Sequence, residues 1–517
     1  MRTTNKNVGA SAILLALGIL LLAPSEESFA SSKTSSSPNT ILVAESKPLT
    51  VLYALESVLK LPMRSPSIAE RICDTKSLPA ETSKEEAAQI NVRCATARAL
   101  GKKAFATVAR SVAFWPGSTT HSTGYQGGWN IEEVLEVAAV QSTSIQNFIE
   151  RAAPLFPAPA LINLKAALEQ LEPLVQTRLL NKRSPFQRRA KEVLLNAISE
   201  RRLHEFLSKT GELIGSEWPA DLPITVALVP VPISRGSGTP TYAHRSGPLV
   251  IIEVLEDDNL EHRLGVIAHE LVHVLWFARP LARVEQLAAA FRASSPTFGR
   301  IALTLLSEGI ATALGNGLFV TQNTQKIPSG EWYADPNIDR FAKLLYPMLK
   351  ERMQNFSPID ETFAKDVVEI FGARAPDAIF SPQLNFRHTI VIADALFTGD
   401  EMLSERIRTN LGSERVQVLK GIKAEIGREI VAHLGDYGTL LIAPPDNISI
   451  LEPFVRQEQL NQLIGTKKRL KTPEVVTCRT SRGKWYAIIL ARSVQELEAG
   501  LHKLARAPKI PLCGRIH

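Results

Sequence analysis

Apolar residues recur at helical spacing over most of the first half of the chain. Between Leu49 and Ser216 they lie three or four residues apart, and Pro and Gly mark the breaks. The clearest run contains Leu161, Leu164, Leu168, Leu171 and Leu174. The pattern predicts a helical N-terminal region over residues 49–216.

The period of the apolar residues changes near Leu222. The segment from Ile224 to Ile233 is rich in β-branched residues, and Leu249–Val254 is a second such run after a Gly, Ser and Pro stretch. Two strands are expected here. Helical patterning then continues, with interruptions, from Asn259 to about Asn410, so we treat residues 222–410 as one predicted domain.

Beyond residue 410 the pattern alternates between helix and strand. Helices are expected at 413–434, from 448 and at 494–504, and strands at 439–443 and 485–490. This alternation predicts a small C-terminal α/β module over residues 411–517. The expected fold class is α+β and mostly helical.

The first 30 residues have the composition of a signal peptide. Arg2 and Lys6 precede an apolar run over residues 8–23, and Ser28 and Ala30 are the small residues that a signal peptidase reads. A retained membrane anchor is the alternative, although the run is short for a bilayer span. We therefore expect a bacterial periplasmic or secreted protein with a Ser-rich linker over residues 31–48 and no stable membrane span after cleavage.

Length and charge restrict the classes of partner. A chain of 517 residues corresponds to roughly three domains. The net charge of +7 comes from 59 basic and 52 acidic residues spread along the chain, whereas nucleic-acid binding requires a concentrated basic surface. Nucleic acid is therefore excluded as a partner, and no pattern specifies an oligomeric state.

The four cysteines lie in two sequence-local pairs. Cys73 is close to Cys94, and Cys478 is close to Cys513, so two local disulfides are the simplest pairing in an oxidising compartment. Four buried free thiols are the alternative. No Cys-x-x-Cys spacing is present, so the cysteines do not predict a metal site.

The segment His269-Glu270-Leu271-Val272-His273 carries the chemistry. Two imidazoles four residues apart project from one face of a helix and can share a tetrahedral metal ion. Glu270 then lies beside the metal, where its carboxylate can take a proton from water and deliver it to a leaving amine. The surrounding residues are apolar on almost every side, so the helix is expected to be buried. Two separately hydrogen-bonded core histidines are the alternative.

A catalytic zinc site needs a third protein ligand and one open position. Glu308 is the candidate, because it is the one acidic residue in an apolar helical stretch expected from Ile301 to Leu314. An exposed surface glutamate is the alternative, which the apolar neighbours disfavour. The histidine-triad form of the motif is excluded, since residues 274–280 contain neither the Gly nor the third His it requires.

At these residues the sequence resembles the gluzincin metallopeptidases, the group containing thermolysin-like enzymes and aminopeptidases of the aminopeptidase N type. The strand Leu249–Val254, the His-Glu-Leu-Val-His helix and the Ser-Glu-Gly-Ile-Ala segment match, the last being similar to the Asn-Glu-Gly-Phe-Ala stretch of the family. The resemblance implies that His269, His273 and Glu308 bind Zn²⁺ and that Glu270 is the general base. It also implies a zincin-like catalytic domain over residues 222–410, with substrate extended along an edge strand, predicted as Leu249–Val254.

Two features depart from the family pattern. The gap between His273 and Glu308 is much longer than in the well-known families, so residues 279–300 are expected to form an inserted loop or helix. Thermolysin-like enzymes place an Asp four residues after the glutamate ligand to orient a histidine, and Thr312 stands here instead. The groups that orient the ligands must therefore differ.

A donor to the oxyanion of the tetrahedral intermediate is also required. Tyr333, Tyr346 and His388 are available, and Tyr346 is favoured because it lies on a helix expected from Ile338 to Met348. The sequence thus predicts an exported zinc metallopeptidase acting on peptide or protein substrates. The alternative is an extracytoplasmic binding or assembly protein that retains the zincin-like scaffold without peptidase activity.

Overall fold

The computed structural model describes the greater part of the chain and serves as the structure below. It covers residues 40–61, 64–77, 82–111, 131–219, 222–232, 241–255, 258–261, 263–398, 402–419, 437–451, 454, 473–480 and 484–516. The predicted signal peptide and residues 31–39 of the predicted linker lie outside the described residues.

Helices form most of the described chain, as the apolar spacing predicted. The first part contains α1 (Lys47–Leu59), α2 (Pro66–Cys73), η2 (Thr75–Ser77), α3 (Lys84–Ser111), α4 (Ile131–Val140), α5 (Ile145–Ala152), α6 (Ala158–Val175), η4 (Gln176–Leu180), α7 (Asn181–Glu200) and α8 (Leu203–Ile214). The middle part contains α9 (Leu264–Phe277), α10 (Leu281–Ser294), α11 (Phe298–Ala311), η5 (Thr312–Phe319), α12 (Val320–Thr324), α13 (Pro336–Gln354), α14 (Glu361–Arg374), η6 (Pro376–Phe380) and α15 (Pro382–Asn385). The α+β, mostly helical class is confirmed.

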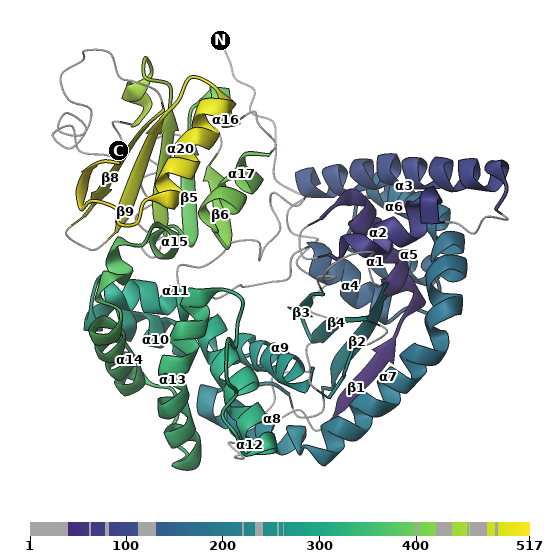
Figure 1. Ribbon diagram of the computed structural model, residues 1–517, viewed down its shortest axis with the longest axis horizontal. Helices are drawn as coiled ribbons and strands as arrows, with labels where there is room; N and C mark the ends of the chain where they lie inside the picture. The colour runs from purple at the N-terminus through teal and green to yellow at the C-terminus, as the bar shows by residue number, and fades with distance from the viewer. Residues whose placement is uncertain are drawn as a thin grey trace, which may run out of the picture. The chain divides into compact units, whose positions relative to one another are not determined.

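A four-stranded sheet lies among these helices, with strand order β1-β2-β4-β3 (Figure 1). Its strands are β1 (Ile41–Glu45), β2 (Ile224–Val231), β3 (Ala243–Ser246) and β4 (Leu249–Leu255). β1, β2 and β4 are parallel, and β3 pairs antiparallel with β4. The linker prediction is wrong for residues 41–45, because this segment alternates buried and exposed residues and completes the sheet.

Both faces of this sheet are covered by helices. Val226, Leu228 and Ile252 belong to a core shared with α7, α8, α9, α11 and α13. Ala227 and Ile251, one residue out of phase, belong to a second core shared with α1, α3, α4 and α6. The helical N-terminal region is therefore not a separate domain from the segment predicted as residues 222–410. Its helices cover one face of the sheet that this segment contains.

The C-terminal part contains a six-stranded sheet of order β10-β8-β9-β7-β5-β6. Its elements are β5 (His388–Ala393), α16 (Ala395–Thr398), α17 (Leu403–Leu411), β6 (Arg415–Leu419), β7 (Gly438–Ala443), η7 (Ile448–Leu451), β8 (Glu474–Arg479), β9 (Trp485–Leu490), α20 (Val494–Arg506) and β10 (Cys513–Arg515). β5, β6, β7 and β9 are parallel, and α20 packs on this sheet (Figure 1). The predicted strands at 439–443 and 485–490 and the helix at 494–504 are confirmed.

Two sequence predictions for this module are wrong. β5 was included in the helical pattern up to Asn410, so the sheet begins before the predicted boundary at residue 411. A buried central strand reads as an unbroken apolar run, which periodicity alone does not distinguish from a helix. The helix expected at 413–434 begins instead with β6, and residues 420–434 lie outside the described residues.

The predicted disulfide pairing is confirmed. Cys73 is bonded to Cys94, and Cys478 is bonded to Cys513. The second bond joins two neighbouring strands, because Cys513 of β10 lies opposite Cys478 of β8. No described cysteine is free.

One described stretch, Phe298–Thr324, is long and apolar enough to cross a membrane by length and composition alone. It comprises α11, η5 and α12. Of its apolar window, 72% is buried inside the fold, and a core helix passes the same test. The stretch is therefore explained by its central position among the packed helices.

A buried ion network links the N-terminal helices to the sheet. The Arg64 guanidinium donates to Glu56 of α1 at 2.5 Å and to Glu136 of α4 at 2.6 Å. Its plane also lies over the Tyr53 ring, 4.4 Å from the centroid. Burial raises the pKa of Glu56 to about 7, even though Arg64 acts in the opposite direction. Arg64 is thus the cation that compensates two buried carboxylates.

We expect Arg64→Met to destabilise the protein by about 3–5 kcal/mol, because it leaves Glu56 buried without its cation and Glu136 with His244 as its remaining partner. The urea-unfolding midpoint followed by tryptophan fluorescence measures this loss. The loss should be smaller at pH 5 than at pH 8, since a carboxyl group whose folded-state pKa is raised to about 7 is protonated at the lower pH. The exposed Arg151→Met is the control and should change stability by no more than about 0.5 kcal/mol. Equal midpoints for the two variants would contradict this role.

Candidate metal centre

The helix α9 carries the two histidines inside the core. All of its residues from Leu264 to Trp276 are buried except Val266, so it has no solvent-facing stripe. His269 and His273 are 4% and 6% exposed. Imidazoles buried this deeply need polar partners.

The partner element is the continuous helical stretch formed by α11 and the π-helical turn η5. Gly315 of η5 packs directly on α9, because a Cβ atom there would lie 2.4 Å from the backbone nitrogen of His269. Glycine is required at this crossing, since any side chain would separate the two helices. The close approach places Glu308 of α11 opposite the imidazoles, and π-helical turns are frequent at functional sites.

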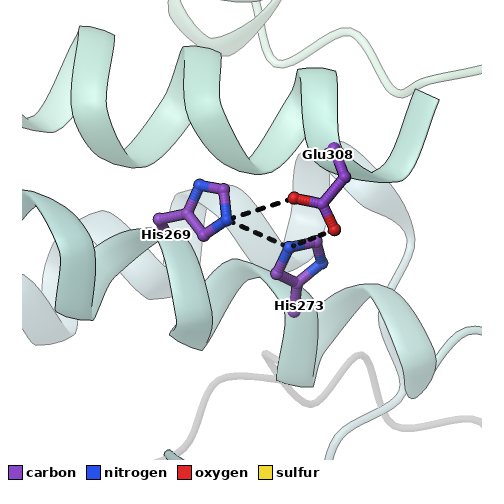
Figure 2. A group of neighbouring side chains, drawn as sticks. All are labelled: His269, His273 and Glu308. Atoms are coloured by element: carbon purple, nitrogen blue, oxygen red, sulfur yellow. Dashed lines mark hydrogen bonds and ion pairs between the residues drawn. The ribbon is translucent and has the colours of Figure 1, made fainter. Parts of the chain in front are cut away.

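Three side chains from these two helices converge on one point (Figure 2). The Nε2 atoms of His269 and His273 are 3.1 Å apart. The Glu308 carboxylate lies 3.5 Å from His269 Nε2 through Oε2 and 3.2 Å from His273 Nε2 through Oε1. The structure therefore brings together the three ligands expected from the sequence, and the exposed-glutamate alternative does not describe Glu308.

The separations agree with the donor set of a zinc ion. Zn–N and Zn–O bonds of about 2.0–2.2 Å at tetrahedral angles put ligand atoms roughly 3.3–3.5 Å apart. The three observed separations lie between 3.1 and 3.5 Å. Two imidazoles and one carboxylate also leave one of four positions for a water molecule or a substrate.

The outer nitrogen of each imidazole contacts a hydroxyl group of the α11–η5 stretch. His273 Nδ1 lies 3.2 Å from Ser307 Oγ, and His269 Nδ1 lies 3.4 Å from Thr312 Oγ1. These contacts leave the Nε2 atoms of both rings facing the Glu308 carboxylate. Two imidazole nitrogens and a carboxylate that face one another are a donor set that can hold a metal ion.

Both hydroxyl groups contact the imidazoles from the α11–η5 stretch, which also carries Glu308. Thr312, which stands where the resemblance places an Asp, contacts His269, and a different group was expected there. Ser307 was not predicted for this role. The available signal is its position immediately before Glu308, on the same helix as Thr312.

The electrostatics of the cluster favour an ionised carboxylate. Burial alone would raise the pKa of Glu308, but the His273 charge and hydrogen bonds from both imidazoles hold it well below its usual value. The pKa of His273 is raised, since the Glu308 carboxylate outweighs the opposing effect of burial. Glu308 is therefore in the deprotonated form that metal binding requires.

Glu270 lies beside the cluster without belonging to it. Its Oε1 is 3.9 Å from His269 Nε2, and its side chain is about one-tenth exposed. The carboxylate is thus close enough to reach a small molecule held at the three ligands. This placement suits a base that takes a proton from that molecule.

Tyr333, and not the favoured Tyr346, contacts the candidate ligands. The Tyr333 ring stacks on the His269 ring with centroids 5.7 Å apart. Burial and then the negative charges of Glu308 and Glu270 raise the pKa of Tyr333, which keeps its hydroxyl group protonated. Tyr333 is therefore a neutral hydrogen-bond donor at the site, and it replaces Tyr346 as the candidate oxyanion donor.

Tyr346 has a packing position. Its ring lies edge-on to Trp332 at 5.4 Å, and its hydroxyl group is buried without a hydrogen-bond partner among the described residues. The described contacts of His388 are with Glu414 and Tyr437. Tyr346 lies on the helix α13, as predicted. A position on a rigid helix does not by itself decide where the side chain points.

The predicted docking edge is also corrected. Leu249–Val254 lies in β4, which pairs with β2 on one side and with β3 on the other, so it is an interior strand. The edge strand beside α9 is the short β3. Its four residues are mostly polar, which is why hydrophobic patterning did not detect it. Residues 279–300, which were expected to form an inserted loop or helix between the ligands, contain the helix α10.

Comparison of the chain with known protein families, with curated proteins and with solved structures found no match.

Proposed function

We propose that this protein is an exported zinc-dependent metallopeptidase. The observation that carries the proposal is the convergence of His269, His273 and Glu308 at ligand spacing, with Glu270 beside them. A buried structural zinc site would have four protein ligands, whereas three are present among the described residues. The two disulfides support an oxidising compartment and so agree with export.

The proposed domain is zincin-like in its arrangement. A mostly parallel sheet ends in an antiparallel edge strand, β3, next to the helix with the two histidines, and the carboxylate ligand comes from a following helix. The resemblance to gluzincins rests on the helix with the two histidines, the segment that carries Glu308 and the strand β4, whereas the edge strand is β3 and not β4. In this protein the proposed domain includes β1, which completes the sheet, and the helices α1 to α6, which share a core with one face of the sheet.

Side chains of the protein carry out most steps of the proposed mechanism. His269, His273 and Glu308 would hold a zinc ion, which would supply Lewis acidity to polarise the scissile carbonyl and to lower the pKa of water. Glu270 takes a proton from the attacking water and delivers it to the leaving amine. The Tyr333 hydroxyl group donates a hydrogen bond to the oxyanion of the tetrahedral intermediate. Ser307 and Thr312 hold the two imidazoles in the orientation that binds the metal.

Metal analysis together with a peptide-library digest tests the proposal. We expect one zinc per chain, cleavage of library peptides, loss of cleavage with a chelator and recovery on addition of Zn²⁺. Zinc binding without cleavage of any library peptide would favour the alternative of a binding protein with a retained scaffold. Absence of zinc binding would reject both.

The oxyanion donor gives a separate prediction. We expect Tyr333→Phe to lower kcat by about 100-fold or more with little change in KM, because one preorganised donor to the oxyanion is lost. Steady-state kinetics on a library-derived peptide measures the effect. Tyr346→Phe is the matched control and should keep kcat within about threefold, since its ring packs on Trp332 and its hydroxyl group has no hydrogen-bond partner among the described residues. A larger loss in Tyr346→Phe than in Tyr333→Phe would reverse the assignment.

A further inference from the structure

The edge strand β3 has backbone groups available on its outer side. The amide of Glu253 donates to the carbonyl of Tyr242, which makes these residues a hydrogen-bonded pair of the antiparallel ladder. Hydrogen-bonded and non-hydrogen-bonded pairs alternate, so the backbone groups of Ala243 and Arg245 point away from β4. No described strand pairs with that outer edge. An extended peptide can therefore add to β3 by bonding to Ala243 and Arg245.

Arg245 also directs its side chain toward the metal centre. Its guanidinium lies over the ring of Phe277, the last residue of α9, 4.2 Å from the centroid. The Phe277 ring is in turn 6.5 Å from the His273 ring. His244, the preceding residue, points to the other side of the sheet and contacts Glu136 and Tyr53. Arg245 thus lies between the outer edge of β3 and the candidate ligands.

The guanidinium is buried but weakly satisfied. The Arg245 side chain is 11% exposed. Its hydrogen bonds with described residues are both 3.5 Å long, one to the Glu133 carboxylate and one to the Gly247 carbonyl. A guanidinium has five N–H donors in a planar fork, and desolvation without close partners is costly. A carboxylate that accepted two parallel hydrogen bonds from the Arg245 guanidinium would satisfy these donors.

We propose that Arg245 recognises a carboxylate of the peptide substrate close to the scissile bond. The proposal rests on the proposed peptidase function and names its substrate class. A peptide residue paired with Arg245 across the edge has its side chain on the same face of the sheet as the guanidinium, and opposite charges so placed attract. The carboxylate is either an Asp or Glu side chain or the C-terminus of a short substrate, since both offer the same two oxygens.

One set of peptides separates these sources. A cleavable peptide from the library is prepared in three forms that differ near the scissile bond: Glu with an amidated C-terminus, Gln with a free C-terminus placed two residues after the bond, and Gln with an amidated C-terminus. We expect the wild type to cleave one of the first two with kcat/KM about tenfold or more above the third. In Arg245→Gln this ratio should fall to about one, whereas the exposed control Arg188→Gln should keep the wild-type ratio.

The outcomes distinguish the two proposals. Equal cleavage of all three peptides by the wild type, or an unchanged ratio in Arg245→Gln, would overturn the role of Arg245 while leaving the peptidase proposal intact. The wild-type ratio needs no variant, so it tests the inference even if Arg245→Gln does not fold. Failure of the wild type to cleave any library peptide would overturn the peptidase function. Arg245 would then be tested by fluorescence anisotropy of the labelled Glu and Gln peptides, and equal affinities would reject carboxylate recognition.

Discussion

Replacing Glu270 by Gln is expected to abolish peptide hydrolysis while leaving the zinc content unchanged. Glu270 lies 3.9 Å from His269 Nε2 and is not one of the three converging ligands. The amide keeps the size of the side chain but cannot accept the proton of the attacking water. Loss of a general base costs about 100-fold to 10,000-fold in rate, so kcat should fall at least that far.

The measurement combines steady-state kinetics, metal analysis and the melting temperature of the same preparation. The exposed Glu285→Gln on α10 is the matched control and should retain wild-type kcat. Equal activity of Glu270→Gln and wild type would remove Glu270 as the base. Loss of zinc together with activity would show instead that Glu270 supports the metal.

The second large effect is expected from Glu308→Ala, which should weaken zinc binding by about 100-fold or more. The substitution removes the only carboxylate among the three converging ligands, and it leaves two imidazoles that cannot neutralise the ion. Removal of a group that merely orients a ligand costs about 10-fold to 100-fold in affinity, so a ligand itself should cost at least as much as the upper end of that range.

Competition with a chromophoric chelator measures the zinc affinity of Glu308→Ala. The rise in melting temperature on adding Zn²⁺ provides a second readout, because a ligand that binds only the folded state stabilises it in proportion to the logarithm of its affinity. Glu285→Ala is the control. Unchanged zinc affinity in Glu308→Ala would exclude this carboxylate from the metal centre.

The fold was predictable where periodicity is strong and local. Most of the helices, including α20, and the strands β2, β4, β7 and β9 follow from apolar spacing. β1, β3 and β6 did not, because short strands with few buried residues, such as β3 with Ser246 alone buried, carry little pattern. β5 did not because a strand buried on both faces lacks alternation.

Domain boundaries were less predictable than elements, for a physical reason. The N-terminal helices cover one face of the four-stranded sheet, as the core shared by Leu52, Leu168 and Ile251 shows. This contact joins residues far apart along the chain, and no local pattern reports it. The same holds for β1, whose partner β2 follows about 180 residues later.

Some residues of the candidate site were likewise predictable from local sequence, and others depend on tertiary placement. The pair His269 and His273 follows from helical spacing alone, and Glu308 from its isolation among apolar residues. The choice between Tyr333 and Tyr346 depends on tertiary placement, since both lie near the same helix in sequence. Arg245 was invisible to motif analysis because its position on an edge strand, and not its neighbours in sequence, brings it beside Phe277.

X-ray absorption at the zinc edge, on protein loaded with one equivalent of Zn²⁺, tests the central claim most directly. We predict a four-coordinate ion with two imidazole nitrogens and two oxygens at about 2.0–2.2 Å, and loss of one imidazole shell in His273→Ala. A spectrum with sulfur ligands, or one that is the same in the wild type and in His273→Ala, would contradict it.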